Sequence, residues 1–128
     1  MEAEDLDKLS YKVIGVALNL HRALGPGLLE AAYEEAFAYD LREAGIDVKR
    51  QVPVPFVYKG VKQDVGFRMD LLIEDQIVIE LKAMENLAPV HFAQTLTYFK
   101  LFDRRLGFLI NFNVKRLKDG IHGVVNDF

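Results

Sequence analysis

The apolar positions in the first part of the chain recur every three or four residues, a spacing that is typical of amphipathic helices. Over residues 6–24 this pattern predicts a first helix, which the sequence Gly25-Pro26-Gly27 would break. The same spacing predicts a second helix over residues 28–44, and Gly45 is well placed to end it. The chain therefore begins with two helices, each with one apolar face that needs a partner.

The pattern then changes to the alternation of apolar and polar residues that indicates strands. Residues 51–58 alternate in this way, although Pro53 and Pro55 favour an edge or irregular strand. Lys59-Gly60 predicts a hairpin turn, which would lead into a long second strand over residues 61–73.

The rest of the chain predicts a turn at residues 74–76, a third strand at 77–82, a third helix at 89–103 and a fourth strand at 107–112. Residues 121–125 are a candidate fifth strand. Helices packed on a central mixed sheet follow from this order of elements, ααβββαβ(β). The expected fold class is therefore α/β, of the mixed α+β kind.

Composition narrows the class of protein. With 51% hydrophobic and 27% charged residues, the chain has the profile of one soluble domain, which we expect to span residues 1–128. The absence of cysteine excludes a disulfide framework and a thiolate metal site, and it suits a reducing cytoplasm. The acidic start, MEAEDLDKLS, is unlike a signal peptide, and no apolar stretch approaches a membrane span. We therefore expect a cytoplasmic protein that contacts no membrane.

The net charge of −3 argues against a protein that coats nucleic acid nonspecifically, but the charge is unevenly distributed. Residues 100–118 are strongly basic and contain a single acid, Asp103. This region could contact phosphate groups while acids elsewhere hold a metal ion, or it could be a solvated face. Its basic residues are Lys100, Arg104, Arg105, Lys115, Arg116 and Lys118.

Three charged residues, Asp70, Glu80 and Lys82, lie inside otherwise apolar predicted strands. If residues 74–76 form a three-residue loop, the hairpin register places Asp70 directly opposite Glu80, where like charges repel. A two-residue loop would instead place Asp70 opposite Leu81. The matching of apolar residues across the hairpin favours the first register.

Two carboxylates held close together are explained if they share a proton or a cation. Oxygen-only ligands suit Mg²⁺ or Mn²⁺, which take one or two carboxylates together with waters and phosphate oxygens. Lys82 lies two residues from Glu80 on the same face of the strand and could then reach a scissile phosphate or the attacking water. The alternative is that Glu80 and Lys82 are exposed residues on the wet face of an antiparallel strand.

These residues resemble a known family. Asp70, then Glu80-Leu81-Lys82, a helix and a strand are similar to the PD-(D/E)XK nuclease superfamily, whose restriction-endonuclease-like core runs helix, three-stranded meander, helix, strand. More narrowly, GLLEAAY at residues 27–33 resembles the G-x-x-E-x-x-Y signature of the small bacterial GxxExxY proteins. The two resemblances together cover nearly the whole chain. Met69 stands where the superfamily name has proline, a departure that removes no ligand.

The resemblance implies a role for each matching residue. Asp70 and Glu80 would be metal ligands, and Glu30 would add a further acid to the metal site from the preceding helix. Lys82 would position or activate the water and stabilise developing charge. The alternative for Glu30 is a solvated acid on the helix surface.

Two further residues, Gln94 and Tyr98, resemble the Q-x-x-x-Y element of exonuclease-like branches, which implies contact with the substrate. Their spacing of four puts both on one helix face. The alternative is that Tyr98 packs in the core and Gln94 caps it. The three histidines, His21, His91 and His122, lack zinc-ligand spacing, so we expect satisfied or surface histidines.

The expected function is a metal-dependent phosphodiesterase, a nuclease that uses Mg²⁺ or Mn²⁺ and acts on nucleic acid, with DNA favoured over RNA. Two alternatives remain open. One is a noncatalytic module that keeps the nuclease fold and binds nucleic acid or protein, and the other is an interaction subunit of a larger complex. The sequence does not distinguish an endonuclease from an exonuclease, and it leaves a homodimer open.

Overall fold

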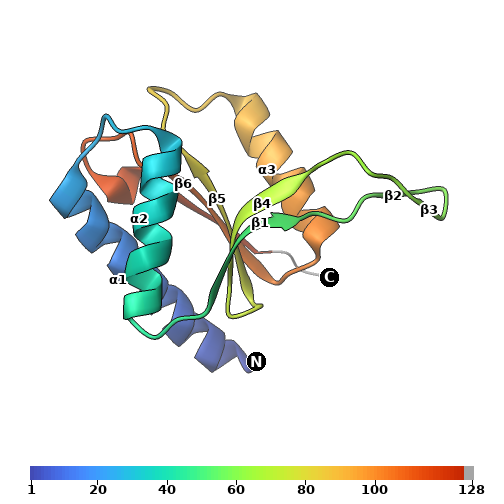
Figure 1. The fold of residues 1–128 in the computed structure, drawn as a ribbon, viewed down its shortest axis with the longest axis horizontal. Coiled ribbons are helices and arrows are strands. Elements are labelled where there is room, and N and C mark those ends of the chain that lie inside the picture. The colour runs from blue at the N-terminus through green and yellow to red at the C-terminus, as the bar shows by residue number, and fades with distance from the viewer. Residues whose placement is uncertain (126–128) are drawn as a thin grey trace.

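A five-stranded mixed sheet separates two helical layers in the computed structural model, which describes residues 1–125 (Figure 1). The strands follow the order β1-β4-β5-β6-β7, in which β5 and β6 run parallel and all other neighbours are antiparallel. The mixed α/β fold class is therefore confirmed. The strand bounds are β1 Val48–Pro53, β4 Arg68–Ile73, β5 Ile77–Lys82, β6 Leu106–Asn111 and β7 Ile121–Val125.

The two N-terminal helices, α1 Ala3–Leu24 and α2 Glu30–Glu43, cover one face of the sheet, as predicted. Their buried side chains pack against Leu71, Ile79 and other apolar residues of β4 and β5. The third helix, α3 Pro89–Phe102, covers the opposite face, where Phe99 packs in a second core with Val78. Alternating residues of β5 therefore enter different cores, because neighbouring side chains of a strand point to opposite faces.

The predicted strand over residues 61–73 is wrong, because the structure divides it. Its first part, β3 Val61–Lys62, pairs only with β2 Val57–Tyr58, and this small ribbon projects from the sheet (Figure 1). Gly66, at a φ of 72°, lies just before β4 begins, in a conformation that a strand residue does not adopt. The predicted turn at Lys59-Gly60 is confirmed.

The first predicted strand, residues 51–58, is also displaced. β1 begins earlier, at Val48, and ends at Pro53. A second proline follows at position 55, and since proline has no N–H to donate, the pairing with β4 does not extend through this segment. The short strand β2 then starts independently at Val57.

The β4–β5 hairpin confirms the predicted register. Ile73 pairs with Ile77 across a loop of three residues, and Leu71 pairs with Ile79. Beyond this hairpin, α3 ends at Phe102, and β6 lies one residue earlier than predicted. The candidate fifth strand is β7, at the edge of the sheet beside β6. Within residues 1–125, no helix is both long and apolar enough to cross a membrane.

Candidate functional site

Asp70 lies at a gap in the backbone pairing on both sides of β4. The β1–β4 pairing omits Gln51, which stands opposite Asp70, and resumes at the next pair. The β4–β5 pairing ends at Leu71, one residue before Asp70 is reached. The Leu81 N–H donates instead to Asp70 Oδ2, at 2.7 Å. A side-chain carboxylate thus takes the place of a main-chain acceptor where the two strands diverge.

Glu80 comes close to Asp70 across this gap. Its side chain is only 7% exposed, and it hydrogen-bonds to the Asp70 carboxyl group. Burial raises the pKa of Glu80 to about 9, and the hydrogen bond and the negative charge of Asp70 act in the same direction. Lys82 opposes the shift. Glu80 therefore keeps its proton at neutral pH, next to the Asp70 carboxyl group.

Glu30 approaches the same pair from the first turn of α2. Desolvation of its carboxyl group raises its pKa although the residue as a whole is exposed, and the charges of Asp70 and Glu34 add to the increase, whereas Lys82 lowers it. These charges act on Glu30 because the helix N-terminus faces the ends of β4 and β5. The structure thus brings together all four residues that the resemblance selected from α2, β4 and β5.

The GLLEAAY segment has a local structural explanation. Tyr33 donates its hydroxyl hydrogen to the Gly25 carbonyl at 2.5 Å and accepts the Leu28 N–H at 3.2 Å. Gly27 adopts a φ of 105°, which favours glycine. The tyrosine therefore holds the loop against the first turn of α2, and this contact sets where Glu30 begins the helix.

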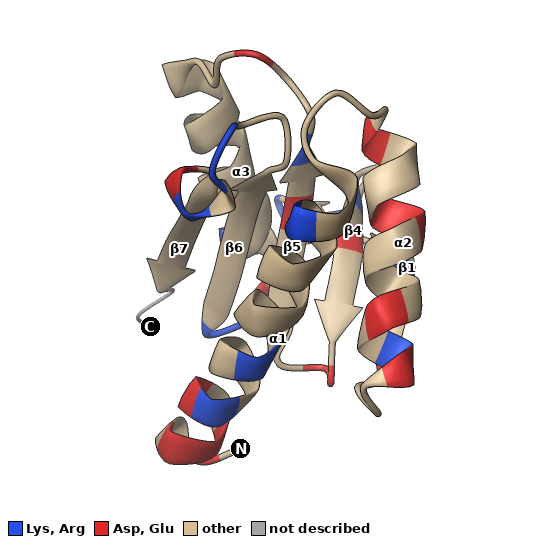
Figure 2. Cartoon of the chain, turned by 90° about the vertical axis from the view of Figure 1, so that its left-hand side faces the viewer, with Lys and Arg blue, Asp and Glu red and all other residues tan. Residues whose placement is uncertain are grey.

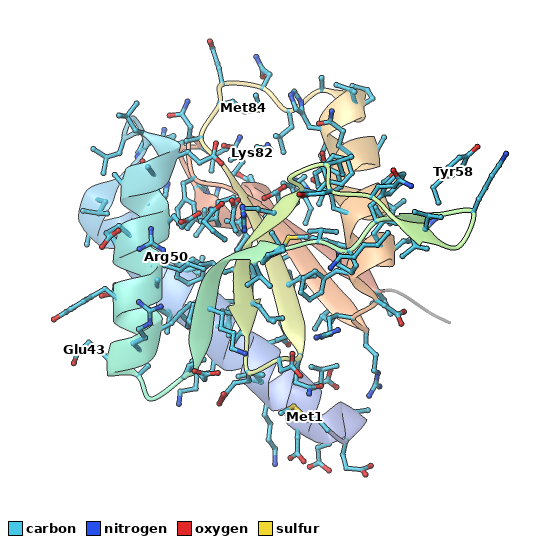
Figure 3. The ribbon with its side chains drawn as sticks, turned by 45° about the vertical axis from the view of Figure 1, so that its right-hand side comes forward. Met1, Glu43, Arg50, Tyr58, Lys82 and Met84 are labelled. Carbon is cyan, nitrogen blue, oxygen red and sulfur yellow. The ribbon has the colours of Figure 1, made fainter. Side chains whose placement is uncertain are left out.

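A group of hydrogen-bonded side chains supports Asp70, and the sequence analysis did not predict it. Gln51 Nε2 donates to Asp70 Oδ1 at 3.1 Å and to Glu34 Oε1 at 2.7 Å. Arg50 pairs with Glu34 at 2.9 Å and with Glu35 at 2.8 Å. Figure 3 shows Arg50 between β1 and α2. Glu34 follows Glu30 by four residues and so shares its helix face, which is a signal that the sequence offered.

The backbone at Lys82 is held on its β6 side. The Phe112 N–H donates to the Lys82 carbonyl at 2.9 Å. The buried Asn111 amide accepts the Met84 N–H at 3.1 Å and donates to the Met84 carbonyl at 2.9 Å. Figure 3 shows Lys82 and Met84 at the same end of the sheet. These bonds therefore fix the backbone from which the half-buried Lys82 side chain extends, next to the acids.

The α3 residues stand apart from this hydrogen-bonded group. Tyr98 packs on Phe67, with ring centroids 5.0 Å apart, as the alternative reading of Tyr98 expected. Gln94 is exposed. None of the hydrogen bonds found within residues 1–125 joins either side chain to Asp70 or Glu80, so their role in substrate contact stays a prediction.

His21 and His91 are hydrogen-bonded, as predicted, and His122 packs on an aromatic ring. His21 is buried, and its Nε2 lies 3.1 Å from the Phe112 carbonyl oxygen and 2.9 Å from that of Val114. His91 Nδ1 accepts the Ala88 N–H at 2.9 Å and so caps the start of α3. His122 packs edge-on against the Phe92 ring.

The chemical type of the available ligand atoms suits a hard divalent cation. Asp70, Glu80 and Glu30 supply only oxygen ligands, and the charge of Asp70 raises the pKa of the other two, so the three carboxyl groups lie near one another. In the described part of the chain, however, no three acidic or histidine side chains already converge as a formed metal cluster. Asp70, Glu80 and Glu30 are therefore the residues that would hold an ion here.

Comparison with known proteins agrees with this geometry. A family model described as the PD-(D/E)XK nuclease superfamily matches residues 7–124, so the chain belongs to this superfamily. Neither the curated proteins nor the solved structures gave a significant match. The narrower resemblance to the GxxExxY proteins stays a prediction.

Proposed function

We propose that the protein is a metal-dependent nuclease that hydrolyses phosphodiester bonds in nucleic acid, with DNA favoured over RNA. The observation that carries the proposal is the buried, hydrogen-bonded pair of Asp70 and Glu80 beside Lys82. Burial and the nearby charge of Asp70 both disfavour the ionised form of Glu80, which is a cost in a fold selected for stability alone. A divalent cation held by the pair would offset that cost.

Asp70, Glu80 and Glu30 would hold Mg²⁺ or Mn²⁺. Bound there, the ion would act as a Lewis acid toward the phosphate and lower the pKa of a coordinated water. Asp70 is oriented for this task because Leu81 and Gln51 each bond one of its carboxylate oxygens and leave further lone pairs free. This is the support that a ligating carboxylate requires in order to keep its orientation.

Lys82 would act on the reacting groups. During hydrolysis a water oxygen bonds to phosphorus while one ester P–O bond breaks, and negative charge builds on the phosphoryl oxygens. An ammonium group held beside Glu80 stabilises that charge and can keep the water in line for attack. The backbone of Lys82 is fixed at the end of β5 by its pairing with β6, so the ammonium group has few positions open to it.

Single-turnover cleavage with purified protein tests the proposal. Wild-type protein should cleave a labelled oligonucleotide with Mg²⁺ or Mn²⁺ and stop when EDTA is added. Glu80→Gln should lose at least about a hundredfold in rate, since a neutral amide is a poor substitute for a charged ligand. Glu43→Gln, which removes an exposed acid from the last turn of α2, is the matched control and should cleave normally. Oligonucleotide binding without cleavage under any of these conditions would support a noncatalytic binding module instead.

A further inference from the structure

The basic region of the sequence divides in the folded protein. Arg104 pairs with Asp75 at 2.8 Å, beside the β4–β5 turn, and Arg105 donates to the Met1 carbonyl. Lys115, Arg116 and Lys118 lie elsewhere, around η1 Leu117–Asp119 in the segment that connects β6 to β7. The proposed nuclease mechanism uses none of these three cations.

These three residues meet a fourth cation, Arg22, around one hollow of about 560 Å³. We call this hollow the basic pocket and define it by Arg22, Lys115, Arg116 and Lys118. Its wall also contains Gly25 and Pro26 of the α1–α2 loop and the apolar side chains of Leu18 and Leu117. The volume lies within the range of ordinary ligand sites.

The pocket is a built feature, because partly buried hydrogen bonds hold its two sides in place. His21, one residue before Arg22, bonds the Val114 carbonyl directly before Lys115. On the other side, Gly25 is bonded by Tyr33. The α1 end and the 113–118 segment are thus fixed to each other and to the loop that leads into α2.

The charges of the pocket are uncompensated. Within residues 1–125, none of its four cations forms an ion pair with a carboxylate, and Arg22 bonds only the Asn19 amide oxygen. By contrast, Arg50 and Arg104 each pair with an acid. Four like charges gathered around one hollow of a protein with a net charge of −3 favour an anionic ligand.

The pocket lies at the same end of the sheet as the proposed active site. Gly25 and Pro26 are in its wall, and the loop that they begin ends at Glu30. Figure 2 shows the Lys and Arg segments of the loop after β6 at the same end of the sheet as the tip of β5. A strand that enters the carboxylate site could therefore continue toward the cations.

We propose that the basic pocket binds one nucleotide unit of the substrate strand outside the scissile bond. Its phosphate would contact the cationic rim, and its sugar and base would lie on the apolar wall of Leu18, Pro26 and Leu117. A cationic rim above an apolar wall suits a phosphorylated organic group better than a bare inorganic ion. The choice of a nucleic-acid strand rests on the proposed function.

Titration of metal-free, full-length protein in EDTA tests the ligand. Adenosine monophosphate should shift the backbone amide NMR signals of Gly25 and Leu117 in a saturable way. Inorganic phosphate should do so more weakly, and adenosine should leave them unchanged. Equal responses to phosphate and to the nucleotide would overturn the nucleotide assignment, and so would the absence of any response.

Oligonucleotide binding then tests the connection to the strand. Arg22→Ala/Lys115→Ala removes one arginine and one lysine from the pocket, and Lys100→Ala/Arg105→Ala removes the same charges elsewhere. For a single strand, each lost phosphate contact should reduce the salt slope of log K by about 0.7, so loss of both contacts in the pocket variant should reduce it by about 1.4 and weaken binding at low salt. Far-UV circular dichroism and thermal melting confirm that both double variants fold.

The two proposals can fail independently, because binding is measured without metal or cleavage. Equal losses in the pocket variant and the charge-matched control would overturn the pocket and leave the nuclease proposal standing. If only the pocket variant loses affinity for the oligonucleotide, and wild-type protein shows no cleavage with any metal, the pocket proposal would stand and the nuclease proposal would be overturned. Binding of poly-glutamate as tight as that of an oligonucleotide of equal charge would overturn the choice of nucleic acid.

Discussion

Gln51 Nε2 donates a hydrogen bond to Asp70 Oδ1 at 3.1 Å, at the one position where the β1–β4 pairing is interrupted. Gln51 adopts a φ of 53°, a conformation that non-glycine residues rarely take and that commonly marks functional positions. In this conformation the Gln51 side-chain amide reaches both Glu34 and Asp70, while the Gln51 backbone takes no part in the pairing with β4. The interruption of the sheet and the orientation of the acid thus have one cause.

Gln51→Gly should weaken metal binding without unfolding the protein. Glycine tolerates the positive φ, so the variant removes the amide while it relieves the backbone strain. Loss of a hydrogen bond that orients a ligand typically lowers metal affinity about 10–100-fold. Isothermal titration with Mn²⁺ measures the change. Lys59→Gly, which also replaces a residue of positive φ (52°), is the control and should bind Mn²⁺ normally.

Mn²⁺ or Mg²⁺ should raise the thermal stability of wild-type protein, because a ligand specific to the folded state stabilises that state. The increment should approach about 2.7 kcal/mol when the ion is at about a hundredfold excess over its Kd. Asp70→Asn should remove most of this increment, whereas Asp64→Asn, in the exposed segment before β4, should keep it. An equal metal-induced shift in wild type and Asp70→Asn, measured by calorimetry, would refute the assigned site.

Glu80→Gln should change how the stability of the metal-free protein depends on pH. The pKa of Glu80 is about 9 in the folded protein against an ordinary 4.5, so the folded state keeps a proton that the unfolded state releases between these values. The free energy of unfolding should therefore fall as pH rises from about 5 toward 9. The amide does not titrate, so this fall should be smaller in Glu80→Gln.

The same variant separates a functional Glu80 from a structural one. Near neutral pH its metal-free stability should equal or exceed that of wild type, while cleavage is lost, as expected for a destabilised functional site. Urea unfolding at several pH values provides the measurement. A loss of more than about 1 kcal/mol at neutral pH would point to a structural role for Glu80.

Lys82→Ala should reduce single-turnover cleavage by at least about a hundredfold while oligonucleotide affinity changes little, if the ammonium acts in the transition state. Lys82→Arg should not restore the full rate, because a planar guanidinium replaces a compact point charge. Lys49→Ala, an exposed lysine on β1, is the control. Cleavage by purified Lys82→Ala at the wild-type rate would refute the assigned role and indicate a contaminating nuclease.

Tyr33→Phe should lower activity through Glu30. The variant removes the hydroxyl that bonds Gly25 and Leu28, so the loop before α2 loses a partly buried anchor. We expect a loss of about 1–3 kcal/mol in the free energy of unfolding, together with weaker Mn²⁺ affinity. Tyr39→Phe is the control, because Tyr39 is 63% exposed, and it should alter neither quantity. Unchanged Mn²⁺ affinity in Tyr33→Phe would show that the anchor does not position the site.

The spacing of apolar residues along the chain was enough to predict the two N-terminal helices and the register of the β4–β5 hairpin. The three- and four-residue period predicted α1 and α2, because a helix buries the residues on one side of each turn. The three-residue loop and the apolar match across it predicted the β4–β5 register, and with it the approach of Asp70 to Glu80. Both features depend on neighbours in the chain, which the sequence displays directly.

Tertiary structure decided where the strands stop and which distant groups meet. Alternation continues through residues 61–73, yet only β4 finds a partner in the main sheet, since strand length depends on what lies alongside. Gln51 carries no local signal for its positive φ, which the contacts with Glu34 and Asp70 support. The basic run of residues 100–118 divides between Asp75 at one end and Arg22 at the other, because α1 packs beside the segment after β6. Charge shows in the sequence, but whether a charge is paired depends on the fold.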